Sequence, residues 1–182
     1  MKTMRLAIPA AVLALAAAGC VLVSGQFLLN FDLDDWTAST ASTVTKADID
    51  LTTESDYQDH KDDLKAIADI AVLGKITNNG SEAIGVEVWM TPSSTPAYTT
   101  ADDVRTHATR LWGTLKVQPG ASNAVTIDWD ESAKLFSTAG KTLLLDEAKG
   151  DGQFTLYLIG DTTTYDIDVE HGVLAIVMEF AK

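Results

Sequence analysis

Cysteine is nearly absent from this sequence. Cys20 is the single cysteine among 182 residues, so no disulfide can form within one chain and no site can be built from several thiolates. Histidine is almost as scarce, since His60, His107 and His171 stand apart and no pair has the spacing of metal ligands. A zinc site needs three or four such ligands. The sequence therefore predicts no zinc, no catalytic histidine and no cofactor.

Basic residues are also few. The chain has 13 Lys and Arg against 26 Asp and Glu, a formal net charge of −13. Proteins that bind nucleic acid displace its counterions with clustered Lys and Arg, so this composition predicts no nucleic-acid partner. An anionic membrane surface would likewise repel the folded part of the chain. Any membrane attachment must then come from another source.

One long apolar run is present, the 18 residues from Leu6 to Val23. It follows Lys2 and Arg5 and contains the small residues Ala17-Ala18-Gly19, which suit a peptidase site. This arrangement predicts an export signal over residues 1–19. Two other interpretations stay open. The run could be an uncut transmembrane anchor, since 18 residues are about the minimum for a bilayer, or an ordinary signal peptide that is cut elsewhere.

The segment Ala17-Ala18-Gly19-Cys20 resembles the lipobox of bacterial lipoprotein precursors, although that family usually has leucine where this chain has Ala17. The resemblance implies cleavage between Gly19 and Cys20 and a diacylglycerol on the Cys20 thiol. Val21, in place of an aspartate after the cysteine, implies the outer membrane of a bacterial cell envelope. The chain would then have three parts, a signal peptide (1–19), the lipidated cysteine with a short tether (20–26) and a folded domain (27–182).

The folded part shows mostly strand patterns. The segment QFLLNFDLDDW places Phe27, Leu29, Phe31 and Leu33 on one face and polar residues with Leu28 on the other, which is the period of a half-buried strand. Two runs, 70–77 and 83–91, flank Asn78-Asn79-Gly80 and predict a hairpin, because Asn and Gly tolerate tight turns. Further strands are expected at 111–117, 124–129, 153–160, 164–170 and 172–180.

Short helices are expected between these strands. The helical spacing over 55–68 follows a capping Ser55, and Thr100 caps a second helix over 101–111. A third helix over 130–140 would end at Gly140. The segment 141–149 fits either a strand or a helix. The Ser/Thr-rich residues 37–45 indicate a loop or a loosely paired edge.

About eight short strands without a βαβ rhythm predict a single antiparallel β-sandwich with two or three short helices, preceded by the N-terminal hydrophobic segment. About 160 residues are enough to bury a core without disulfides. The overall pattern of strands, including the segment ITNNGSEAIGVEV, is similar to immunoglobulin-like or late-embryogenesis-type sandwiches of exported proteins. That resemblance concerns architecture and implies no function.

Two segments resemble nucleotide or metal loops only in part. STAGKT at 137–142 lacks the first glycine of a phosphate loop, because Leu135 stands there. DWDES starts like a calcium loop with Asp128, Asp130 and Ser132, but Ala133 replaces the turn glycine. We expect Asp128 or Asp130 to cap a helix instead.

Acidic residues on two strands could meet at an edge of the sandwich. Asp32 and Asp34 on one strand, with Asp166 and Asp168 on another, are candidate calcium ligands. A solvated face of an acidic protein would show the same pattern, so no metal is assigned. The four tryptophans, Trp36, Trp89, Trp112 and Trp129, are expected to pack in the core or at its rim and not to stack on sugars.

These observations predict a non-enzymatic envelope lipoprotein, an acidic β-sandwich that serves as a binding or structural module at a membrane. One alternative is a subunit of a self-assembling surface filament or coat that uses its N-terminal strand. Another is an exported hydrolase whose site comes together from separate loops. A hydrolase should show a deep pocket with convergent polar groups, and an assembling subunit an unpaired edge or a detached N-terminal strand.

Overall fold

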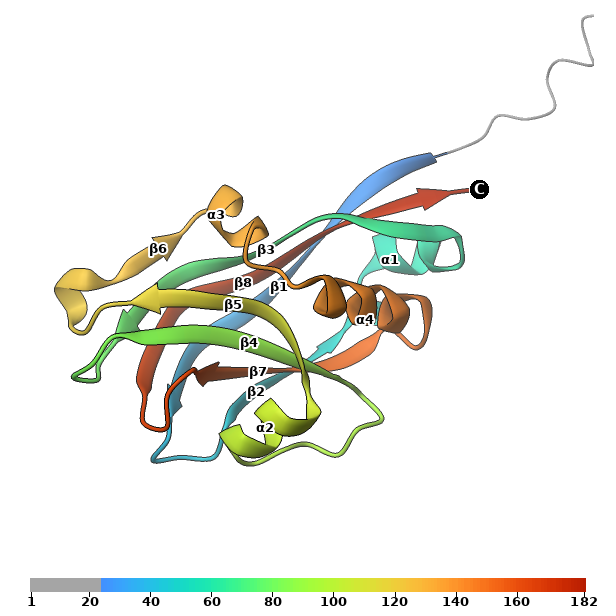
Figure 1. Cartoon of the computed structure of the whole chain (residues 1–182). Coiled ribbons are helices and arrows are strands. Elements are labelled where there is room, and N and C mark those ends of the chain that lie inside the picture. The colour runs from blue at the N-terminus through green and yellow to red at the C-terminus, as the bar shows by residue number, and fades with distance from the viewer. Residues whose placement is uncertain (1–23) are drawn as a thin grey trace, which may run out of the picture.

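A computed structural model describes residues 24–182. They form two four-stranded antiparallel sheets packed face to face (Figure 1). The expected signal peptide, the cleavage site between Gly19 and Cys20 and the lipidation of Cys20 lie outside the described residues. Within residues 24–182, no helix is both long enough and apolar enough to span a bilayer.

The first sheet, sheet A, has the strand order β1-β8-β3-β6. Its strands are β1 (Ser24–Ser39), β3 (Leu64–Asn78), β6 (Val125–Ile127) and β8 (Asp166–Ala181). Sheet B has the order β2-β7-β4-β5. Its strands are β2 (Thr45–Asp50), β4 (Ile84–Pro92), β5 (Thr109–Val117) and β7 (Gln153–Gly160).

The pairing of the strands follows one simple rule. β1 pairs with β8, β2 with β7, β3 with β6 and β4 with β5, all antiparallel. Such pairing arises when one long antiparallel ribbon of paired strands folds over into two sheets. The pair β3–β8 then completes sheet A, and the pair β4–β7 completes sheet B. Eight strands with this connectivity form a jelly roll. The expected single antiparallel β-sandwich is confirmed, while the strand order differs from the immunoglobulin-like one.

Helices occupy the connections between the strands. Helix α4 closes one end of the sandwich, and α2 lies beside sheet B (Figure 1). The helices are α1 (Ser55–His60), α2 (Ala101–His107), α3 (Trp129–Ala133) and α4 (Thr138–Lys149), with 3₁₀ turns η1 (Leu51–Thr53), η2 (Lys61–Asp63) and η3 (Ala121–Asn123).

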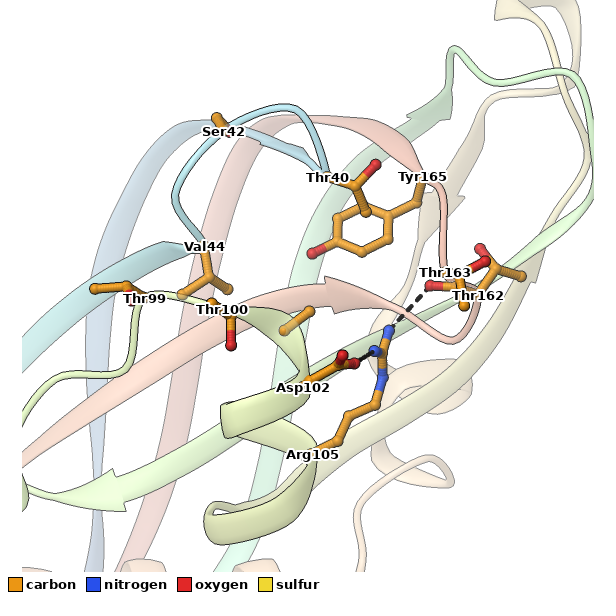
Figure 2. Close-up of a pocket in the computed structure, with 11 residues that line it drawn as sticks. Thr40, Ser42, Val44, Thr99, Thr100, Asp102, Arg105, Thr162, Thr163 and Tyr165 are labelled. Atoms are coloured by element: carbon orange, nitrogen blue, oxygen red, sulfur yellow. Dashed lines mark hydrogen bonds and ion pairs between the residues drawn. The ribbon is translucent and has the colours of Figure 1, made fainter.

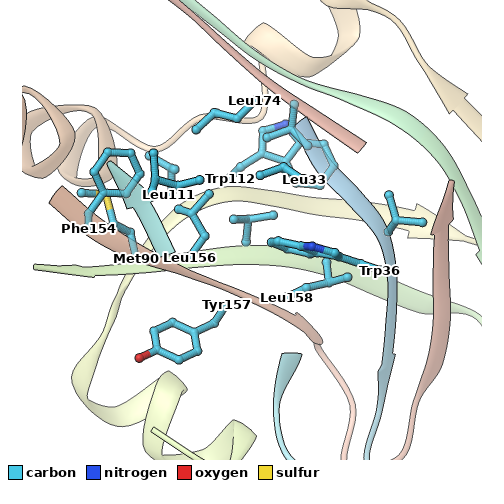
Figure 3. Packing of buried hydrophobic residues seen from close by; sticks show 14 of the residues in the cluster. Leu33, Trp36, Met90, Leu111, Trp112, Phe154, Leu156, Tyr157, Leu158 and Leu174 are labelled. Carbon is cyan, nitrogen blue, oxygen red and sulfur yellow. The ribbon is translucent and has the colours of Figure 1, made fainter. Parts of the chain in front are cut away.

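The core fills the space between the sheets. Figure 3 shows Trp36, Trp112 and Leu158 there, and all three are buried. Tyr157 is buried as well, but its hydroxyl points to the outer side of sheet B, where it accepts a hydrogen bond from the amide of Tyr98 at 3.2 Å. The alternation expected for the first strand is confirmed, since Leu29 and Leu33 are buried on its inner face.

The prediction of a hairpin around Asn78-Asn79-Gly80 is wrong. β3 belongs to sheet A and β4 to sheet B, so this connection crosses between the sheets. The reason is Asn78, which is fully buried and donates hydrogen bonds to the carbonyls of Glu82 and Val117. These bonds fix the crossing instead of a tight exposed turn.

The C-terminal region forms two strands and not three. The strands expected at 164–170 and 172–180 are separated at His171, but β8 runs through this residue to Ala181. His171 has a left-handed φ of 54°, and its amide donates to the Asp35 carboxylate at 2.9 Å. This contact holds an irregularity in the ladder opposite Asp34, which also has a positive φ. The strand therefore bends without reversing.

Three expected helices have different ends. The helix expected over 101–111 stops at His107, because β5 already begins at Thr109. The helix expected over 55–68 stops at His60 and its 3₁₀ extension at Asp63, because Leu64 already pairs with β8. Gly140 does not end a helix. It lies in the first turn of α4, where its amide donates to the capping hydroxyl of Ser137. The ambiguous segment 141–149 is thus helical.

Candidate functional site

One polar hollow lies at the end of the sandwich where the loops β1–β2 and β7–β8 approach the start of α2 (Figure 2). Its volume is about 250 Å³. Thr100, at its rim, caps α2 as expected, and its hydroxyl accepts from the amide of Asp103 at 3.1 Å. The lining is rich in hydroxyl groups, from Thr40, Ser42, Thr99, Thr100, Thr162, Thr163 and Tyr165.

Arg105 is the cation of this hollow, and its guanidinium is already committed. One nitrogen donates to the carbonyls of Gly160 and Thr162 at 2.5 and 3.0 Å, and another contacts the Asp102 carboxylate at 3.0 Å. These bonds tie α2 to the β7–β8 loop (Figure 2). Arg105 therefore acts first as a structural clamp.

Tyr165 is the buried side chain with an ionisable group in this hollow. Burial raises the pKa of its phenol above the usual value, so the ring stays neutral at physiological pH. Among the residues that line the hollow, Asp102 is the one carboxylate and there is no imidazole. Hydroxyl nucleophiles need an adjacent base, and the Asp102 side chain is 93% exposed and paired with Arg105. The arrangement suits hydrogen bonding to a polar surface better than acyl or phosphoryl transfer.

The second candidate surface is the outer edge of β1. Within residues 24–182, β1 forms a ladder with β8 alone, so the other side of this 16-residue strand lacks a strand partner in the described chain. Leu28 lies on β1 with 48% of its surface exposed. Within the described region, Leu28 is the one exposed large hydrophobic side chain. An apolar residue on the outer face of an edge strand is a typical contact point for another chain.

The other sheet edges of the described chain are short or covered. β6 has three residues and β2 six, with Lys46 and Asp48 paired at 2.6 Å on β2. The edge of β5 is capped by the residues that follow α3, because the carbonyl of Leu111 accepts from the amide of Ser137 and the amide of Gly113 donates to the carbonyl of Leu135. β1 therefore offers the longest open edge.

The C-terminal half of β1 is less open than its first half. The hydroxyl of Thr45 donates to the carbonyl of Thr37 at 2.6 Å, which joins β2 to this part of the edge. Between the halves, the register shifts around Asp34, whose amide donates to the Asp32 carboxylate at 2.8 Å. Bulges and acidic side chains are the usual protection of an edge against pairing. The open segment is therefore Ser24 to Phe31.

The four candidate calcium ligands lie on the β1–β8 pair. Asp32 and Asp34 sit at the bulge of β1, and Asp168 is farther along β8, where its carboxylate accepts from the Thr37 hydroxyl at 2.8 Å and the Asn79 amide at 2.7 Å. Asp166 lies opposite Ser39. No group of three or more metal-ligating side chains comes together among residues 24–182. The carboxylates of Asp32 and Asp168 accept hydrogen bonds from other groups of the protein.

The remaining residues singled out in the sequence have structural contacts. His60 stacks on Phe180 with ring centroids 3.8 Å apart, and His107 lies beside Tyr98. Asp128 caps α3 as expected, accepting from the amide of Glu131 at 2.8 Å. The tryptophans pack in the core or at its rim, since Trp36 and Trp112 are buried and Trp89 and Trp129 are partly buried.

The hollow was not identified in the sequence, whereas the N-terminal strand was named there as a possible contact for assembly. The hollow joins three loops that are far apart in the chain, so no local motif marks it. Leu28 did leave a signal, because it is an apolar residue on the polar side of an otherwise regular alternation. The open edge itself follows from strand order, which local patterns do not determine.

No protein-family model and no curated protein matches the chain. Among solved structures, a chain of Mud crab tombus-like virus aligns with all of this chain and 86% of its own length, at 10% identity and a TM-score of 0.40. A chain of Desmodium yellow mottle tymovirus aligns with all of this chain and 95% of its own, at 11% identity and a TM-score of 0.36. Because these scores are low, the class of the fold, a two-sheet jelly roll, is assigned from strand order alone.

Proposed function

We propose that this protein is a structural, non-enzymatic subunit that assembles with a neighbouring chain through the open edge of β1. The observation that carries the proposal is the segment Ser24 to Phe31, an uncapped run of backbone with the exposed Leu28 on it. Strand addition to such an edge supplies main-chain hydrogen bonds without any special motif. The capped or short edges elsewhere in the described chain leave β1 as the favoured contact.

Assembly is tested on the full-length protein in detergent by sedimentation and light scattering. Wild type is expected to form oligomers, and Leu28→Lys to shift them to monomers, because a charged side chain on an edge opposes pairing. Ala68→Lys is the matched control. It adds the same charge to β3, an inner strand of the same sheet, at another exposed position. A wild type that stays monomeric at all concentrations would contradict the proposal.

We further propose that the subunit is held at a bacterial outer membrane by lipid on Cys20. The segment Ala17-Ala18-Gly19-Cys20 supports this, and the acidic domain needs such an anchor because its charge gives no attraction to anionic lipid. Intact mass of the membrane-extracted protein reports cleavage and acylation together. Cys20→Ser should leave the precursor uncut and unlabelled by palmitate, and normal processing of that variant would refute the anchor.

A further inference from the structure

We infer that the occupant of the β1 edge is a second copy of this chain, paired antiparallel and centred on Leu28. This inference rests on the proposed assembly through β1 and names its partner. In such a pair, the two copies of sheet A join into one continuous sheet of eight strands. Within the open segment, the contact would run from Gly25 to Phe31, a ladder of about 23 Å.

Charge along the edge selects the direction of pairing. Asp32, Asp34 and Asp35 follow the open segment, whereas Ser24 to Phe31 carries no charge. A parallel pair in register would place each aspartate opposite its own copy, and like charges directly opposite are destabilising. In an antiparallel pair centred on Leu28, Asp32 faces Ser24 of the second copy. The acidic residues of the two copies then lie at opposite ends of the ladder.

Side chains on the outer face make this pairing self-complementary. Gln26, Leu28 and Asn30 are all exposed on that face. On a twofold axis, Leu28 lies next to its own copy, so one residue supplies both sides of an apolar contact. Gln26 then faces Asn30 of the second copy, and the two neutral amides can exchange hydrogen bonds. A strand from an unrelated protein would have to provide these matches independently.

The local structure limits the contact to the seven residues from Gly25 to Phe31. The bulge around Asp34 ends the regular ladder on one side, and bulges of this kind turn an edge away from a partner. Seven paired residues bury a small area, so the dimer should be weak in dilute solution. Attachment of both copies to one membrane would raise their effective concentration and favour pairing.

A cysteine scan of the full-length chain in detergent tests the register. Each variant carries Cys20→Ser, so that one of Gln26→Cys, Leu28→Cys or Asn30→Cys provides the only thiol. Directly opposed Cβ atoms lie about 4.5–5.5 Å apart, near the span of a disulfide. Oxidation should therefore link Leu28→Cys several-fold more than the other two, whose self-distances are about 13 Å.

Mixing completes the test. Gln26→Cys and Asn30→Cys, carrying tags of different mass, should form a mixed disulfide when combined, because these positions face each other. Ser122→Cys, on the exposed turn η3, measures linkage by random collision. Equal linkage at positions 26, 28 and 30 would indicate a parallel pair and overturn the inference.

The inference and the proposed function fail in different ways. If no scanned position links above the Ser122→Cys level while Leu28→Lys still disperses the wild-type oligomers, the antiparallel register is wrong and assembly through β1 stands. If no position links and the wild type is monomeric, both are wrong.

Discussion

The carboxylate of Asp161 accepts a hydrogen bond from the amide of Gly85 at 2.6 Å, which joins the β7–β8 loop to the start of β4. Its second oxygen pairs with the Lys116 ammonium at 2.5 Å. Burial alone would raise the pKa of Asp161, but these two contacts outweigh burial and lower the pKa below its ordinary value. Asp161 therefore stabilises the fold in its charged form.

Substitution of Asp161 should show this dependence on pH. A carboxyl whose pKa is lowered by folding adds stability above its unfolded pKa, and that stability is lost as the pH falls through the folded pKa. Asp161→Asn keeps an acceptor for Gly85 but loses the charge, so we expect a loss of about 1 kcal/mol at pH 7 after solvent screening. This loss should shrink as the pH falls below about 4, the ordinary pKa of an aspartate. Urea unfolding of both proteins at pH 7 and in acid measures this loss of stability. An equal loss at the two pH values would contradict the ionic explanation.

The buried hydroxyl of Ser132 joins three elements of the core. It accepts from the amide of Val72 at 2.7 Å and from the indole of Trp112 at 3.0 Å. Ser132→Ala leaves the Val72 amide buried without its acceptor, so we expect about 2 kcal/mol of lost stability. Ser122→Ala, on an exposed turn, should change stability by less than about 0.5 kcal/mol. Equal unfolding midpoints for the two variants would refute this role.

The folded structure disfavours the charged form of the Glu147 side chain. Burial raises its pKa first, and the charges of Asp151 and Asp146 raise it further. A raised pKa means that the protonated form fits the fold better, so the associated stability is present below the unfolded pKa and lost as the pH rises through the folded pKa. Glu147→Gln should therefore increase stability at pH 7 by about 0.5 kcal/mol, or ~1–2 °C in melting temperature.

The advantage of Glu147→Gln should vanish at pH 3, where the glutamate is itself protonated. Glu179→Gln is the control for net charge, because it removes one negative charge from an exposed position on β8. A gain of the same size in both variants would mean that general charge repulsion, and not the site of Glu147, is responsible.

Local patterns predicted most elements but not their partners. The alternation around Leu29 identified β1, and Thr100 correctly marked the start of α2, because both depend on neighbouring residues. Whether Asn78 ends a hairpin or a crossing depends on the distant carbonyl of Val117. A sequence window around Asn78 contains no information on that contact, so the sandwich was predicted and its jelly-roll order was not.

Gly140 shows the same limit within a helix. A glycine after an apolar run is typical of a helix C-terminus, and this one lies in the first turn of α4. A Cβ atom there would be 2.6 Å from Cα of Leu111, so the glycine permits close packing of α4 on β5. The requirement comes from tertiary structure and leaves no distinct local pattern.

The distance between Cys20 and the fold leads to the last prediction. The tether was expected to extend to Gln26, but Ser24 to Gln26 lie in β1, so at most three residues separate Cys20 from the sheet. Three residues span at most ~10 Å. If Cys20 carries the lipid, the sandwich must lie against the membrane, with the open edge of β1 close to its surface.

A flexible Gly/Ser spacer of about 20 residues, inserted after Val23, should release the domain from this position. We expect proteases added to membrane vesicles to cut the exposed loop at 93–97 several-fold faster in the spacer variant, because the loop can then move away from the bilayer. The same spacer added after Lys182 leaves the tether unchanged and should have no effect. If cleavage is equally fast in all three proteins, the domain is not held against the membrane by a short link, and anchoring through Cys20 would no longer explain how two β1 edges are brought together.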